Sequence, residues 1–99
     1  MASTDGKIEI ENFTSPGRVY RVDRAKFEAM KAALLAVLPK GAPGLSIKQA
    51  KEKLLPLLPQ DLFPGGDKAG WWLKAAQLDQ EAKGVIARES TKPLQIHKT

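Results

Sequence analysis

The chain has 99 residues, of which 42% are hydrophobic and 27% are charged, and its net charge is +5. This length suits one domain with one modest core, and the composition is that of an ordinary globular protein. There is no cysteine, which excludes disulfides, thiolate metal sites and cysteine nucleophiles and fits a reducing cytoplasm. No stretch approaches the roughly 18 apolar residues that span a bilayer, so we expect no role in a membrane.

The N-terminal part predicts a short tail followed by extended structure. Residues 1–6 are polar and terminal, and we expect them to be disordered. In Lys7–Phe13 isoleucines alternate with glutamates, which predicts a half-buried strand. The segment TSPG at 14–17 has turn chemistry, and Arg18–Val22 favours a second strand. We therefore expect an N-terminal strand or hairpin at the start of a single domain over residues 7–99.

Two helices are predicted next. Asp23 is a suitable N-cap for the first, which ends before Pro39 because the residue preceding a proline avoids the helical conformation. Ser46 and Gln49 match the capping box of a second helix that begins at Ile47. The residues expected to face the core from the first helix lie at helical spacing: Phe27, Met30, Leu34, Val37 and Leu38.

The last third predicts a helix and a hairpin. Asp67 is a candidate cap for the third helix, and Gly84 suits the left-handed residue that follows a helix end. One apolar stripe of this helix is expected to face the core: Trp71, Ala75, Leu78 and Ala82. The segments 85–89 and 93–98 are predicted strands with a turn between them.

Three helices followed by a C-terminal hairpin give an α+β fold class and the element order of a winged helix-turn-helix domain. The segment EAKGVIARE at 81–89 resembles the junction between recognition helix and wing in that family. This resemblance covers about residues 23–98. One position departs from the pattern: winged-helix proteins usually carry a large apolar residue four positions before the glycine, where this chain has Gln80. The register of the third helix therefore stays open.

The whole chain also resembles a small family of uncharacterised bacterial proteins. The likeness lies in SPGR at 15–18, LPQDLFPGG at 58–66, AGWW at 69–72 and the segment EAKGVIARE. It implies a bacterial, cytoplasmic, stand-alone protein and brings no activity with it.

The winged-helix resemblance implies double-stranded DNA as a partner and a DNA-binding or regulatory role, because the third helix of that family enters the major groove. With Trp71 inward, the outer face of the helix would present Lys74, Gln77 and Gln80. Glutamine can read adenine and lysine can contact phosphate or guanine. Arg88 and Lys92 in the wing would pair with phosphates. Acidic residues lie among them and would repel phosphate: Asp79, Glu81 and Glu89.

The alternative is a protein-protein interaction module without nucleic-acid contact. On a helix, Trp71 and Trp72 point about 100° apart, so one stripe cannot bury both. With Trp71 in the core, Trp72 and Leu73 would form an exposed apolar patch for a homodimer or another partner. Packing of both tryptophans within the monomer remains a third arrangement.

The sequence offers little for catalysis. Its single histidine, His97, lies near the C-terminus, and no Ser-His-Asp set can be assembled around it. No metal-ligand spacing and no phosphate-binding loop pattern is found. We therefore expect no enzyme activity, no cofactor and no metal.

Overall fold

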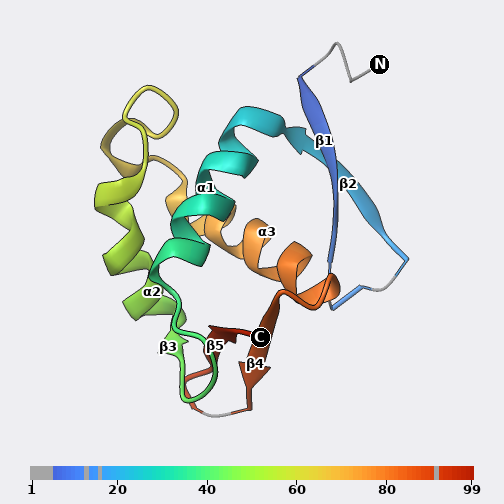
Figure 1. Cartoon of the computed structure of the whole chain (residues 1–99). Coiled ribbons are helices and arrows are strands. Elements are labelled where there is room, and N and C mark those ends of the chain that lie inside the picture. The colour runs from blue at the N-terminus through green and yellow to red at the C-terminus, as the bar shows by residue number, and fades with distance from the viewer. Residues whose placement is uncertain (1–5, 13, 16, 91) are drawn as a thin grey trace.

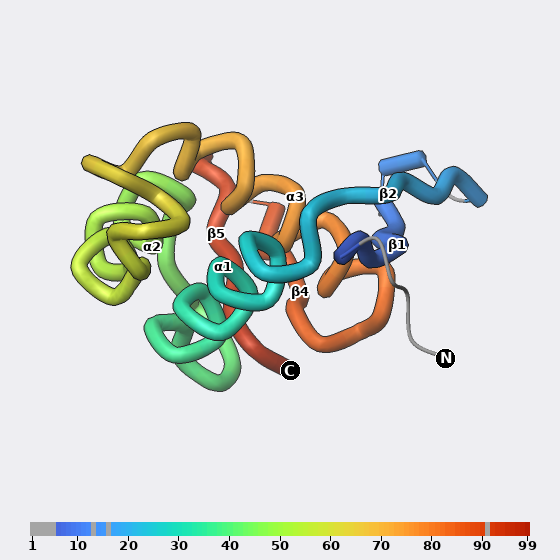
Figure 2. Tube along the Cα trace, turned by 90° about the horizontal axis from the view of Figure 1, so that it is seen from above, coloured from blue at the N-terminus to red at the C-terminus, as the bar shows by residue number. Residues whose placement is uncertain are grey.

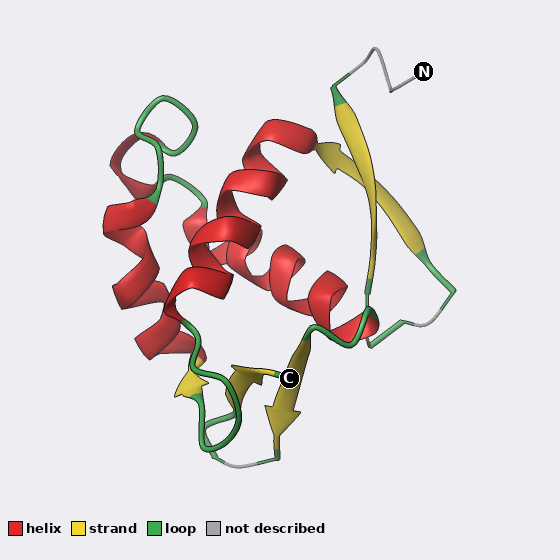
Figure 3. Ribbon diagram, in the orientation of Figure 1, coloured by secondary structure: helices red, strands yellow, loops and turns green. Residues whose placement is uncertain are grey.

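The computed structural model describes residues 6–12, 14–15, 17–90 and 92–99. The disorder expected for residues 1–6 falls outside this range except at Gly6, whose carbonyl oxygen accepts the N–H of Arg24 at 2.8 Å. The chain begins with a β-hairpin of two paired strands, β1 (Lys7–Glu11) and β2 (Val19–Asp23), which confirms the predicted N-terminal hairpin. Figures 1 and 3 show this hairpin at one side of the three helices.

The two faces of the hairpin differ in chemistry. Antiparallel pairing places Ile8 opposite Val22 and Ile10 opposite Tyr20, so these side chains share one face. Ile10 and Val22 are buried on that face. The other face is exposed and mostly charged: Lys7, Glu9, Glu11, Val19, Arg21 and Asp23. The apolar face therefore turns toward the helices.

Helix α1 (Arg24–Val37) follows β2 without a loop. The side chain of Asp23 accepts the N–H of Lys26 at 3.1 Å, which confirms the predicted N-cap. The helix ends at Val37, and the C-cap residue Leu38 is extended before Pro39. Of the predicted core residues only Val37 is partly exposed, and the others are buried: Phe27, Met30, Leu34 and Leu38.

A two-residue strand, β3 (Leu45–Ser46), leads into helix α2 (Ile47–Leu54). The predicted capping box is confirmed: the Ser46 hydroxyl oxygen accepts the N–H of Gln49 at 3.1 Å, and the Gln49 side chain accepts the N–H of Ser46 at 3.0 Å. Two proline-containing 3-10 turns then connect α2 to the third helix: η1 (Leu55–Leu57) and η2 (Pro64–Gly66).

Helix α3 (Ala69–Ala82) ends as predicted and begins differently. At its end Gly84 has φ +77°, and the N–H of Val85 bonds to the carbonyl of Gln80 at 2.9 Å, as in a Schellman motif. At its start the predicted cap at Asp67 is wrong. The N–H of Asp67 bonds to the carbonyl of Pro64 within the preceding turn, and Lys68, with φ +57°, begins the helix without a side-chain cap.

The chain ends in the predicted hairpin, made of β4 (Ile86–Glu89) and β5 (Gln95–Lys98). Strand β3 joins it on the free side of β5, so the antiparallel sheet has the order β3-β5-β4. A strand between the first two helices is thus paired with the end of the chain. The fold is α+β, with three helices and two small antiparallel sheets among the described residues.

The core lies between the three helices and both sheets. Buried side chains from Ile10 to Ile96 form one cluster, in which Phe27, Phe63 and Leu34 are fully buried. Figure 2 shows the hairpin of β1 and β2 projecting beside α3.

Candidate functional site

An open groove of about 740 Å³ lies between the N-terminal hairpin and α3. This volume falls in the range of about 300–1,000 Å³ that ligand sites occupy. Its lining is mainly apolar with a few charged groups at the rim: Ile10, Glu11, Asn12, Val19, Tyr20, Arg21, Val22, Trp71, Lys74, Ala75 and Leu78. Among the described residues, five large hydrophobic side chains are exposed, and Val19, Tyr20 and Trp71 belong to this groove.

The helix wall of the groove depends on how α3 is turned. Trp71 is 58% exposed and Ala82 is exposed, whereas Trp72 and Leu73 are buried, so the predicted orientation of this helix is wrong at these positions. The exposed patch expected at Trp72 and Leu73 is wrong for the same reason. Leu78 of the predicted stripe is buried, and Ala75 packs against the core. The stripe that faces the core has the spacing i, i+3, i+4, i+7: Ala69, Trp72, Leu73 and Ala76.

Trp71 is held in place by its neighbour. Its ring lies 4.9 Å from that of Trp72, centroid to centroid, at 76°, and Trp72 in turn meets Phe63 edge-on at 6.5 Å. Edge-to-face pairs of this kind add about 0.5–1.5 kcal/mol to the burial of the rings. The exposed indole of Trp71 therefore rests on a packed aromatic base.

The hairpin wall presents a second aromatic residue. Tyr20 follows the buried face of the hairpin but is 37% exposed at its margin. The guanidinium of Arg18 lies over its ring, 5.7 Å from the centroid, which is a cation–π distance. With Lys74 exposed on α3, the groove has an aromatic residue and a cation on each wall.

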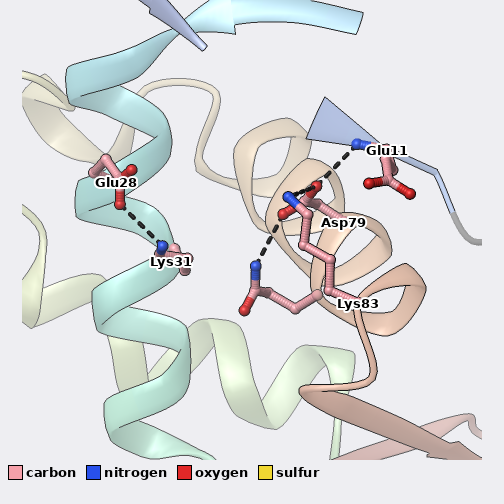
Figure 4. Close-up of polar contacts among 6 residues, drawn as sticks. Glu11, Glu28, Lys31, Asp79 and Lys83 are labelled. Atoms are coloured by element: carbon pink, nitrogen blue, oxygen red, sulfur yellow. Dashed lines mark hydrogen bonds and ion pairs between the residues drawn. The ribbon is translucent and has the colours of Figure 1, made fainter. Parts of the chain in front are cut away.

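A buried carboxylate ties the two walls together. Asp79 of α3 is fully buried, and its side chain accepts the main-chain N–H of Glu11 at 2.9 Å. The same carboxylate accepts hydrogen bonds from the Gln80 amide at 2.9 Å and the Lys83 ammonium at 2.7 Å. Figure 4 shows Glu11 and Lys83 converging on Asp79. These contacts fix β1 against the C-terminal half of α3.

The residues predicted to bind DNA do not form one surface. Lys74 and Lys92 are exposed, but Gln77 and Gln80 are buried at 4% and 5% exposure, so the predicted outer face of α3 is wrong at these two positions. The hairpin, α1 and β4 enclose this half of the helix. Arg88 lies in β4, within the C-terminal hairpin, and it is held by another side chain.

Arg88 and Glu81 link β4 to α3. Arg88 donates two hydrogen bonds to the Glu81 carboxylate, at 2.7 and 2.8 Å. The hydrogen bond to Glu81 raises the pKa of Arg88, burial opposes this rise, and the negative charge of Glu81 adds a smaller rise. This bidentate geometry directs the guanidinium toward the protein rather than toward a ligand.

His97 is also engaged within the fold. Its Nδ1 lies 2.9 Å from the carbonyl oxygen of Lys98, and its Nε2 lies 3.1 Å from the Glu89 carboxylate. The carbonyl of Lys98 raises the pKa of His97 most, and Glu89 raises it further. In the described part of the chain no group of three His, Cys, Asp or Glu residues is placed to hold a metal ion. No described helix has the length and apolar character needed to traverse a bilayer.

The groove residues that sequence reasoning missed are Val19, Tyr20 and the exposed Trp71. A compositional signal for the exposure of Trp71 is missing, because the two stripes available on α3 each carry one tryptophan, one leucine and two alanines. Tyr20 and Val19 carry no such signal, since their role depends on where the hairpin docks.

Comparison with known proteins places the chain in a family. The model of a family of unknown function (DUF6958) matches residues 7–96, from β1 into β5. No curated protein and no solved structure gives a significant match. The match confirms the expected likeness to an uncharacterised family. It covers nearly the whole chain, and the protein therefore belongs to the family of unknown function DUF6958.

Proposed function

We propose that the chain is a non-catalytic protein-interaction module with a winged-helix-type fold, and that it binds a segment of a partner protein in the groove between the hairpin and α3. The observation that carries the proposal is the convergence of Val19, Tyr20 and Trp71 on one groove. Exposed apolar patches with aromatic anchors are typical of protein-binding surfaces. The site is thus the predicted interaction module, moved from Trp72 to the other face of α3.

The sheet order supports the winged-helix part of the proposal. The elements follow as α1, β3, α2, α3, β4 and β5, and the last two strands form a hairpin that pairs with β3. The N-terminal hairpin is an addition to this arrangement. A bacterial and cytoplasmic setting, implied by the likeness of the four sequence segments, belongs to the same proposal.

Duplex DNA is the second candidate, supported by the exposed Lys74 and Lys92. The geometry favours DNA binding less than it favours a protein partner. A helix with its side chains is about 10–12 Å across and nearly fills a major groove about 12 Å wide. Since β1 is bonded to α3 through Glu11 and Asp79, the hairpin lies where one wall of the DNA groove would pass. The two glutamines that would read bases are also buried.

A random peptide library displayed on phage tests the proposal. We expect the immobilised wild-type protein to enrich peptides with bulky apolar residues. The enriched peptides should bind the Trp71→Ala variant at least about tenfold more weakly. This loss corresponds to about 1.4 kcal/mol, as expected for an interface anchor. The matched control is Leu57→Ala, which removes a large side chain, 53% exposed, outside the groove. Equal binding to both variants, or no enrichment, would contradict the proposal.

The DNA candidate has its own measurement. Anisotropy of a labelled random duplex at about 50 and 200 mM salt reports phosphate contacts as a steep loss of affinity with salt. We expect no such binding. Steep salt dependence that is reduced by Lys92→Gln would favour the nucleic-acid function instead.

A further inference from the structure

The outer edge of β2 borders the groove and exposes its main chain at Val19. Within the described chain, β2 pairs only with β1. In an antiparallel ladder alternate residue pairs exchange hydrogen bonds. The N–H of Arg24 bonds to Gly6, and by the same register Val22 and Tyr20 bond to Ile8 and Ile10. The N–H and carbonyl of Val19 therefore point away from β1.

The groove follows this edge rather than only one face of the hairpin. Four consecutive residues of β2, from Val19 to Val22, line it. Side chains alternate between the two faces of a strand. Because residues from both faces of β2 line the groove, the groove runs along the edge of the strand. Val19 is 54% exposed there. An exposed apolar edge strand is a template for pairing with another chain.

The charges at the rim of the groove indicate the charge of the peptide segment that would bind there. The cations among the lining residues are Lys74 on the helix wall and Arg21 on the hairpin wall, and Arg18, outside the lining, lies over the ring of Tyr20. Glu11 is the one acidic residue among the lining residues. A second copy of this chain would bring the same cations against these, and like charges facing each other are destabilising. An acidic segment is complementary to them.

We propose that the groove takes an extended, acidic segment of a partner protein, which adds to the outer edge of β2 at Val19 and inserts a bulky apolar side chain between Tyr20 and Trp71. This inference rests on the proposed interaction function and specifies its ligand. Strand addition supplies main-chain hydrogen bonds for affinity, and the pocket for alternate side chains supplies specificity. The floor of Ile10, Ala75 and Leu78 suits an aliphatic or aromatic residue.

Two synthetic peptides test the ligand class: the alternating peptide EVEFEVE and its basic counterpart KVKFKVK. At about 1 mM, the range of weak complexes, we expect the acidic peptide to bind the wild-type protein and the basic peptide to bind at least about tenfold more weakly. Lys74→Glu should weaken the acidic peptide and strengthen the basic one. The matched control is Lys53→Glu, which makes the same charge change on an exposed lysine of α2 outside the groove.

Amide hydrogen exchange tests the binding mode. On saturation with EVEFEVE we expect exchange at Val19 to slow by about tenfold or more, since its N–H gains a partner. The amide of Tyr20, which already bonds within the hairpin, is the internal control and should change little. If Trp71→Ala abolishes binding but the bound peptide leaves amide exchange at Val19 unaltered, strand addition is overturned and the interaction function stands.

Two further outcomes overturn the inference. If EVEFEVE does not bind, or if both peptides bind equally, the ligand is not an acidic segment. This conclusion holds even if the phage library has enriched other peptides, in which case the interaction function itself stands. An oligothymidylate that binds with steep salt dependence and depends on Trp71 would assign the groove to single-stranded nucleic acid, whose bases stack on aromatic side chains.

Discussion

The carboxylate of Asp79 accepts the main-chain N–H of Glu11 at 2.9 Å, joining residues 68 positions apart in the sequence. Replacing Asp79 by Ala would leave this N–H and the Gln80 amide without their acceptor, at about 1–3 kcal/mol for each buried group. We expect Asp79→Ala to lower the free energy of unfolding by about 2–3 kcal/mol, measured by urea titration. Asp61→Ala, at an exposed position, is the control. Equal stability of the two variants would contradict this role.

The contact between Glu81 and Arg88 predicts a second loss of stability. The Glu81 side chain is only 2% exposed, so Arg88→Gln would leave a buried carboxylate without its cation. We expect a loss of about 2–3 kcal/mol, in the range of hydrogen bonds to charged groups. Lys92→Gln removes an exposed cation between β4 and β5 and should change stability by less than about 0.5 kcal/mol. If thermal unfolding shows the two variants to be alike, Arg88 is not a structural residue.

His97 predicts a pH dependence of stability. Its pKa is raised in the folded protein above the unfolded value, because the Lys98 carbonyl and Glu89 favour the protonated ring. This contribution is fully present below about pH 6.5, the ordinary pKa of histidine, and is lost as pH rises through the folded pKa. Relative to His97→Gln, the wild type should therefore have its larger advantage in melting temperature at pH 5.5 and a smaller one at pH 8.5. A constant difference would contradict the prediction.

Gly44 predicts a site intolerant of any side chain. Its φ is +81°, and an added Cβ would lie 2.8 Å from the main-chain carbon of Ile96 in β5. The left-handed conformation alone costs an L-residue about 1–2 kcal/mol. We expect Gly44→Ala to lower stability by at least this amount in urea unfolding. The control is Gly41→Ala, where φ is +85° and the space around the Cβ is open, so only the conformational cost applies. Equal losses of stability in the two variants would show that the clash contributes nothing.

The parts of the fold that could be predicted from the sequence depend on neighbours a few residues away. Asp23 and Ser46 cap helices through bonds that span three residues, and Gly84 ends α3 through bonds that span three to five. Pro39 stops α1 for an equally local reason. By contrast, β3 is two residues long and exists because Leu45 pairs with Ile96, far along the chain.

The orientation of α3 was not predicted because the C-terminal half of the helix breaks the amphipathic rule. Residues 77–81 are buried on every side although four of the five are polar. Burial at Asp79 and Glu81 is possible because each meets donors from another element, Glu11 and Arg88. A sequence pattern that sorts polar residues outward cannot anticipate such partners. The candidate site could not be predicted for a similar reason, since most of its lining residues come from the hairpin.

The groove is assembled from two parts of the chain, residues 10–12 and 19–22 of the hairpin and residues 71–78 of α3, and neither part forms it alone. A molecule whose hairpin has come away from α3 has no site, so an occupant binds only the docked form and stabilises it by mass action. Occupancy and docking of the first strands are therefore one equilibrium. Resistance of residues 7–23 to a protease would rise with ligand concentration and report the dissociation constant without any label.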